Sequence, residues 1–288
     1  MRKLIYIAAL TIAAFSVYAA DRKDALRHTL GTYSNAPRLK NGRIDCDLLI
    51  KQLLELHANC YSFTIHRAAT DWDDFKIFLP MARSNHLRVW VSLVPPSESP
   101  PHTKAYCEPF RLDYERWAIE FAKLSLQETN LVGWSLDDFP YNLKFFTPER
   151  MKNILDGAHK INPDFAFVPC VYFKQLTPIF IKEYIPMCDG ILFPYRDESH
   201  GGNLKDPSHV EDEVKSIRAR LPKDYPIIVD IYYTAHSRLG ASTAEYCEKT
   251  TIASHKCGDG VQVYTHQDPE KNADKYQIIK RLFTEWSH

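Results

Sequence analysis

The feature that most constrains the fold is a repeated alternation along the chain. A short apolar run, a polar loop and an amphipathic run follow one another eight times. Short apolar runs bounded by loops are typical of buried strands, and apolar residues at helical spacing indicate helices packed on one face. The predicted strands cover residues 29–34, 59–66, 87–94, 131–139, 165–172, 190–196, 226–233 and 260–266.

Helix starts mark the second half of the chain. A capping residue precedes a proline four times, at Thr147-Pro148, Thr177-Pro178, Asp206-Pro207 and Asp268-Pro269. Such pairs are typical of the first turn of a helix, where proline leaves no hydrogen bond unmade. The last helix is expected to run from about Pro269 to Trp286.

Strands that alternate with helices predict an α/β fold, and eight repeats predict a single (β/α)8 TIM barrel, for which about 250 residues is typical. The alternative is a doubly wound open sheet, which would need a glycine-rich phosphate turn after an early strand. No such turn occurs, and the whole chain holds only ten glycines. The barrel is therefore the preferred architecture.

The N-terminus has the features of a secretory signal peptide. Arg2 and Lys3 precede an acid-free apolar run over 4–17, and Val17-Tyr18-Ala19 offers small residues at the cleavage offsets. We expect a signal peptide over 1–19, a barrel over 20–288 and a secreted or periplasmic protein. The run is short for a spanning helix, so stable membrane insertion is not expected; an uncleaved anchor is the alternative.

Charge and cysteine content limit the partners. Without Arg2 and Lys3 the chain has 34 basic and 36 acidic residues, a net charge near −2. That balance lacks the basic stripe of a nucleic-acid-binding protein, so no nucleic acid is expected as a partner. Seven cysteines are present without a Cys-x-x-Cys pair, and Cys247 and Cys257 are the first candidates for a disulfide. The sequence predicts no cofactor.

The chemistry of such a barrel is expected at the carboxyl ends of its strands. The fourth predicted strand ends at Asp137-Asp138, and alternation places Asp137 on the same small-residue face as Gly133 and Ser135. The structural alternative is that the two acids only end the strand and cap the next segment. Other strand ends also carry aromatic and polar residues, which suit the apolar faces and hydroxyl edges of sugars. The residues expected to bind substrate are Tyr33, His66, Asp138, Tyr172, Tyr195, Arg196, Tyr232, Gln262 and His266.

Two stretches carry a resemblance to a known family. Gly133-Trp134-Ser135-Leu136-Asp137-Asp138-Phe139 and Phe193-Pro194-Tyr195-Arg196 resemble the TIM-barrel glycoside hydrolases. In many of these enzymes a strand-four carboxylate is catalytic, so the resemblance implies hydrolysis of a glycosidic bond in an oligo- or polysaccharide, with Asp137 as a catalytic residue. The chain departs from that pattern because no glutamate ends a strand; Glu98 and Glu198 fall in loops.

Glycoside hydrolysis uses two carboxyl groups, one protonated and one charged. We expect Asp137 to be the charged group, with Asp230 as the first candidate for its partner and Asp197 as the second. Alternation sends Asp138 to the opposite face, where it would brace Arg196 or a loop. Arg196 is predicted equally well to bind substrate or to be a buried ion-pair partner of Asp137 or Asp138 without a substrate role.

Two other functions compete with the glycosidase. One is a barrel that binds carbohydrate without cleaving it, which the missing strand-end glutamate favours. The other is a metal-assisted hydrolase that uses His66, Asp137, Asp230 and His266, whose side chains suit a divalent cation. No His-x-His or His-x-x-x-His spacing supports the metal site.

Overall fold

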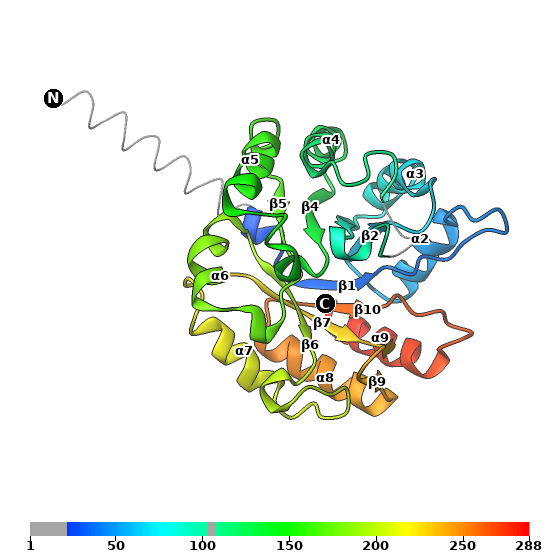
Figure 1. Cartoon of the computed structure of the whole chain (residues 1–288). Helices are drawn as coiled ribbons and strands as arrows, with labels where there is room; N and C mark the ends of the chain where they lie inside the picture. Colours follow the sequence, from blue (N-terminus) through cyan, green and yellow to red (C-terminus); the bar gives the residue numbers. More distant parts are fainter. Residues whose placement is uncertain (1–21, 103–106, 288) are drawn as a thin grey trace, which may run out of the picture.

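The computed structural model describes residues 22–102 and 107–287. The predicted signal peptide over 1–19 lies outside the described residues. Within them, eight parallel strands curl into a ring with helices on its outside (Figure 1). The strands are β1 Thr29–Tyr33, β2 Cys60–Ile65, β3 Arg88–Leu93, β4 Leu131–Leu136, β5 Ala166–Phe167, β6 Ile191–Tyr195, β7 Ile227–Tyr232 and β10 Gly260–Tyr264.

The order of the strands is that of a barrel. Neighbouring strands pair in the order β5-β4-β3-β2-β1-β10-β7-β6, so the first and last strands of the chain, β1 and β10, lie side by side. The ring closes behind β5, where the Leu192 amide donates to the Pro169 carbonyl at 3.0 Å and the Val171 amide donates to the Leu192 carbonyl at 2.9 Å. This architecture confirms the predicted (β/α)8 barrel.

Eight α-helices pack around the described part of the ring. Asp113 and Thr147 cap two of them by accepting hydrogen bonds from the amides of Arg116 and Arg150. Such side-chain caps satisfy amides that have no partner inside the helix. The helices are α2 Cys46–Glu55, α3 Asp71–Ser84, α4 Tyr114–Gln127, α5 Pro148–His159, α6 Pro178–Glu183, α7 Val210–Arg218, α8 Ala244–Cys257 and α9 Ala273–Trp286.

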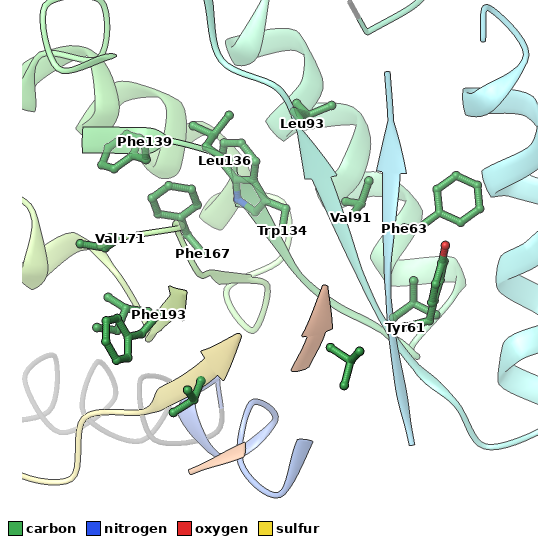
Figure 2. Packing of buried hydrophobic residues seen from close by; sticks show 14 of the residues in the cluster. Tyr61, Phe63, Val91, Leu93, Trp134, Leu136, Phe139, Phe167, Val171 and Phe193 are labelled. Carbon is green, nitrogen blue, oxygen red and sulfur yellow. The ribbon is translucent and has the colours of Figure 1, made fainter. Parts of the chain in front are cut away.

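Alternate residues of each strand face the helices or the interior of the ring. The outward residues build the main core between strands and helices, including the aromatic rings of Phe63, Trp134 and Phe167 (Figure 2). The inward residues near the amino ends of the strands form a second, smaller apolar cluster. We call this cluster the lower interior; it comprises Leu26, Cys60, Trp90, Ala166, Val168, Leu192 and Ile228.

The fifth strand is shorter than the predicted range of 165–172. Regular pairing covers only Ala166–Phe167, with one further bridge between Cys170 and Leu192. Pro169 has no amide hydrogen to give to a neighbouring strand, so the ladder is interrupted there.

Two of the four predicted helix starts are wrong. Helices α5 and α6 begin at Pro148 and Pro178 as expected, but α7 begins at Val210 and α9 at Ala273. At the other two sites the aspartate makes a local turn: Asp206 accepts from the Ser208 amide, and Asp268 accepts from the amides of Glu270 and Lys271. Aspartate side chains that bond nearby amides in this way compete with helix formation.

The suggested disulfide is also wrong. Cys247 and Cys257 are free thiols ten residues apart within α8. A rise of 1.5 Å per residue separates their Cα atoms by about 15 Å, far beyond the reach of a disulfide. No helix among the described residues is long and apolar enough to cross a membrane.

Candidate active site

A cavity of about 370 Å³ opens at the carboxyl ends of the strands. Four carboxyl groups line it, from Glu98, Asp137, Asp138 and Asp230, and aromatic and basic side chains make up much of the remaining wall. Its other polar and aromatic lining residues are Tyr33, Tyr141, Cys170, Tyr172, Arg196, Tyr232, His236, Ser237, Arg238 and Tyr264. The strand order therefore brings residues from the whole length of the chain to one concave site, the expected form of a ligand site.

Asp137 lies at the centre of the acidic group. It follows β4 directly, and both of its carboxylate oxygens accept hydrogen bonds: Oδ2 from the Tyr33 hydroxyl at 2.9 Å and Oδ1 from the Asp138 amide at 3.0 Å. Burial, and then the neighbouring Asp138 charge, raise the pKa of Asp137 to about 6. The two hydrogen bonds act against this rise because they stabilise the charged form.

Asp138 lies in the same cavity as Asp137, so the prediction that it faces away is wrong. The alternation of a strand no longer applies there, because β4 ends at Leu136 and Asp138 is left-handed, with φ 43° and ψ 35°. Carboxylate oxygens of Asp137 and Asp138 and the Cys170 sulfur all lie within 4.8 Å of one another. Left-handed backbone at a non-glycine residue is costly and is often found at functional sites.

Glu98 is the acidic residue that sequence reasoning left in a loop. It ends the short 3-10 helix η1 Pro96–Glu98, which follows β3 and brings its side chain into the cavity. Burial, and then the charges of Asp137 and Asp138, raise the pKa of Glu98 to about 7. The available signal was its position: Glu98 follows the Pro95-Pro96 break at the end of the third strand, on the rim where chemistry is expected.

Asp230 and Gln262 lie deeper in the ring, as neighbours on β7 and β10 in register. Asp230 is only 3% exposed, and its Oδ1 atom has no hydrogen-bond partner among the described residues. Burial, and then the charge of Asp137, raise the pKa of Asp230 well above its usual range. Gln262 is fully buried and is not part of the cavity wall.

Tyr172, Tyr232 and Arg196 line another part of the cavity wall. The Arg196 guanidinium lies 3.7 Å from the centroid of the Tyr172 ring. Its ion-pair partner is Glu198, not Asp137 or Asp138 as one expectation held. Glu198 is two residues further along the same loop, which sequence alternation could not reveal.

Two predicted site residues on and after β6 lie outside the cavity. Tyr195 pairs in register with Ile231 on the outward face, and its hydroxyl donates to the Asp206 carbonyl at 2.9 Å. Asp197 accepts hydrogen bonds from Asn203 and from the Nδ1 atoms of His200 and His209. The structure therefore gives Asp197 a loop-bracing position away from the cavity that holds Asp137.

His66 and His266 line a different cavity, of about 320 Å³, beside β1 and β2. Nδ1 of His266 lies 2.9 Å from the Thr32 hydroxyl, and its Nε2 lies 2.9 Å from the Gln52 side-chain oxygen. The structure does not bring these histidines together with Asp137 and Asp230, which removes the ligand set of the metal-assisted hydrolase. Each histidine follows the carboxyl end of a strand, as predicted. The strands end at Ile65 and Tyr264, however, so the histidines lie outside the ring and line the other cavity.

Two clusters among the described residues have metal-ligand chemistry, Asp137–Asp138–Cys170 and Asp197–His200–His209. In the first, burial raises the pKa of the Cys170 thiol well above its usual range. In the second, the two imidazole rings stack with centroids 3.6 Å apart and planes 17° apart. Lone pairs in nearly parallel ring planes cannot both point at one ion, so this cluster is better described as a hydrogen-bonded brace.

Comparisons with known proteins support the fold and not a family assignment. No protein-family model and no curated protein sequence matches the chain. The structure is similar to the catalytic domain of Thermobifida fusca endoglucanase Cel5A, with a TM-score of 0.62 and 11% identity over 90% of this chain and 92% of that one. The resemblance to barrels of glycoside hydrolases is thus confirmed at the level of the fold.

Two larger enzymes give the same result. A GH2 β-galacturonidase from Eisenbergiella tayi matches with a TM-score of 0.61 and 11% identity, covering 90% of this chain and 51% of that one. A β-glucuronidase from Bacteroides uniformis matches with a TM-score of 0.56 and 12% identity, covering 83% and 30%. The chain spans about half the length of the galacturonidase and less than a third of the glucuronidase.

Proposed function

We propose that this protein is an exported glycoside hydrolase that cleaves an oligo- or polysaccharide in the cavity containing Asp137. The observation that carries the proposal is the meeting of Glu98 and Asp137, two carboxyl groups in different environments, at the carboxyl rim of the barrel. Two carboxyl groups, one protonated and one charged, are the usual acid and base of glycoside hydrolysis. The basic and apolar N-terminal run supports export.

Asp137 acts as the charged group in this proposal. Hydrogen bonds from Tyr33 and from the Asp138 amide hold both of its oxygens and stabilise the carboxylate. A fixed carboxylate can serve as the nucleophile or as the base for a water molecule, and it stabilises the positive charge that develops on the sugar.

Glu98 acts as the general acid. With a pKa of about 7, a large share of Glu98 is protonated at neutral pH, so it can give a proton to the leaving oxygen. Glu98 also supplies the glutamate whose absence from the strand ends favoured a binding protein without catalysis. We assign a positioning role to Asp230, which lies deeper in the ring.

The aromatic wall suits a sugar ring. Tyr33 and Tyr264 lie with ring centroids 5.2 Å apart, and Tyr264 and Tyr232 with centroids 5.4 Å apart, so three tyrosines adjoin around the cavity. Flat aromatic faces pack on the C–H face of a sugar while the carboxyl groups bond its hydroxyls.

The test is a screen of oligo- and polysaccharides for release of reducing ends, with Asp137→Asn as the matched control. We expect the wild-type protein to release reducing ends from at least one glycan. We expect Asp137→Asn to lose about 10³-fold or more of that activity, because the substitution removes the charge and keeps the shape. Unchanged turnover in Asp137→Asn, or no release from any glycan, would contradict the proposal.

A further inference from the structure

One part of the cavity wall carries an excess of positive charge. It is formed by Arg196, His236 and Arg238, and an adjoining hollow of about 270 Å³ adds Lys174. We call these four residues the basic wall. Its three fixed cations face one carboxylate, Glu198, which already accepts from Arg196 and from the Lys174 amide. One carboxylate against three cations leaves the basic wall with an excess of positive charge.

Arg196 is a buried cation with an unused donor. It is 6% exposed, and its Nε atom has no hydrogen-bond partner among the described residues. A buried guanidinium normally uses its donors fully, because an unpaired one costs desolvation energy. Nε itself is closed to solvent, so an acceptor in the cavity would have to approach Arg196 at another part of its guanidinium group.

His236 points to the same conclusion through its protonation. Its Nδ1 atom accepts from the Arg238 amide at 3.1 Å, so a neutral ring carries its proton on Nε2. Nε2 lies 3.4 Å from Nη1 of Arg196, which is also a donor. Two donors face each other without an acceptor, and an oxyanion placed against both would accept from each.

The charge state of the histidine is consistent with this arrangement. Burial, and then the positive charges of Arg196 and Arg238, lower the pKa of His236, so the ring is neutral at pH 7. The negative charge of Asp138 has the opposite, smaller effect and raises the pKa of His236. No ion pair joins Asp138 to Arg238, whose exposed guanidinium has no partner among the described residues.

We propose that the basic wall binds an oxyanion carried by the substrate, so that the glycan cleaved here is acidic, with a uronate carboxylate or a sulfate ester. Arg196 and Nε2 of His236 would hold the oxyanion, and Arg238 would supply charge from the hairpin formed by β8 Ala235–His236 and β9 Gly240–Ala241. This proposal rests on the proposed function, since it names the substrate class of the same cavity. The raised pKa values of Glu98 and Asp230 lessen the negative charge of the acidic group, and so the repulsion that such a substrate would meet.

The test compares matched pairs of acidic and neutral glycans. The probes are oligogalacturonate and its methyl ester, glucuronoxylan and unsubstituted xylan, and a sulfated galactan and its desulfated form. Binding is measured with the full-length Asp137→Asn protein, so that turnover does not consume the probe. We expect an acidic member to bind at least about tenfold more tightly than its neutral partner, and the uronate and sulfate pairs identify which oxyanion is preferred.

Arg238→Gln in the Asp137→Asn background provides the variant. It should weaken binding of the acidic glycan about tenfold and leave neutral glycans unchanged, because Arg238 is exposed and its loss removes only charge. Arg116→Gln is the matched control, since Arg116 pairs with Glu120 on the outer helix α4. Equal binding of acidic and neutral members, no binding of any acidic probe, or acidic binding that is independent of Arg238 would overturn the proposal.

The outcomes separate the two proposals. Asp137-dependent cleavage of neutral glycans alone would keep the hydrolase and overturn the acidic substrate. Tight binding of an acidic glycan through Arg238, without cleavage by the wild-type protein, would keep the acidic ligand and overturn the hydrolase.

Discussion

The lower interior of the barrel and the cavity above it use the same strands for opposite purposes. On β7, Ile228 belongs to the apolar lower interior, and Asp230, two residues later, is an acid beside the cavity. On the fifth segment of the ring, Val168 is followed by Cys170 in the same way. One step of the alternation therefore separates a layer that stabilises the fold from a layer that can carry chemistry.

The two layers also differ in how many unsatisfied polar side chains they hold. Buried side-chain atoms without a hydrogen-bond partner among the described residues include those of Thr64, Ser135, Asp230 and Gln262, on inward positions above the lower interior, whereas the lower interior has one such atom, Nε1 of Trp90. Unsatisfied buried polar groups cost stability, so a layer that keeps several of them is being used for something other than folding.

The largest effect expected after loss of Asp137 is that of Glu98→Gln. Without the general acid, glycans with poor leaving groups should be cleaved about 10²–10⁴-fold more slowly, whereas a dinitrophenyl glycoside, which needs no proton, should be cleaved at nearly the wild-type rate. Kinetics on both substrates measure the difference. Glu149→Gln, at an exposed position of α5, is the control, and equal losses on both substrates would assign Glu98 another role.

The lower interior is tested by Leu26→Ala. Leu26 is fully buried beneath the ring, and its removal should lower the free energy of unfolding by about 2–5 kcal/mol. Activity per folded molecule at 25 °C should stay near wild type, because the cavity lies at the other end of the strands. Leu126→Ala, at a residue 56% exposed, should change stability little. A large loss of activity in folded Leu26→Ala would show that the two layers are not separable.

A smaller effect is expected from Tyr33→Phe. The Tyr33 hydroxyl stabilises the charged form of Asp137, so its removal raises the pKa of Asp137. The acidic limb of the pH–activity profile should therefore move to higher pH, by about one unit. Tyr276→Phe, which loses a hydrogen bond to the distant Glu55, should leave the limb in place. If the acidic limb does not move in Tyr33→Phe, the group that titrates there is not Asp137.

The barrel could be predicted from the sequence because its signal is local and repeated. The inward position of Asp137 followed from alternation along β4, and the meeting of Tyr33, Tyr172 and Tyr232 around one cavity followed from the shared rim of parallel strands. These inferences need only the two-residue period of a strand and the rule that the carboxyl ends of parallel strands meet at one rim of the barrel.

The remaining site residues depend on where regular structure stops. Alternation failed at Asp138, which turns left-handed, and at His266, which turns toward α2. The prediction that Tyr195 binds substrate is wrong because the residues that face inward at the end of β6 are Pro194 and Arg196, so Tyr195 between them faces outward. Glu98 reaches the cavity through a 3-10 turn whose direction is set by tertiary packing and not by sequence period.

The most direct test of the account is the pH dependence of kcat/KM for wild type and Glu98→Gln on a glycan that the wild type cleaves. Asp137 must be charged and Glu98 protonated, so activity should rise as the pH passes about 6 and fall as it passes about 7. The account predicts that Glu98→Gln lowers kcat/KM and abolishes the alkaline limb while the acidic limb remains. An alkaline limb that persists unchanged in Glu98→Gln would contradict it.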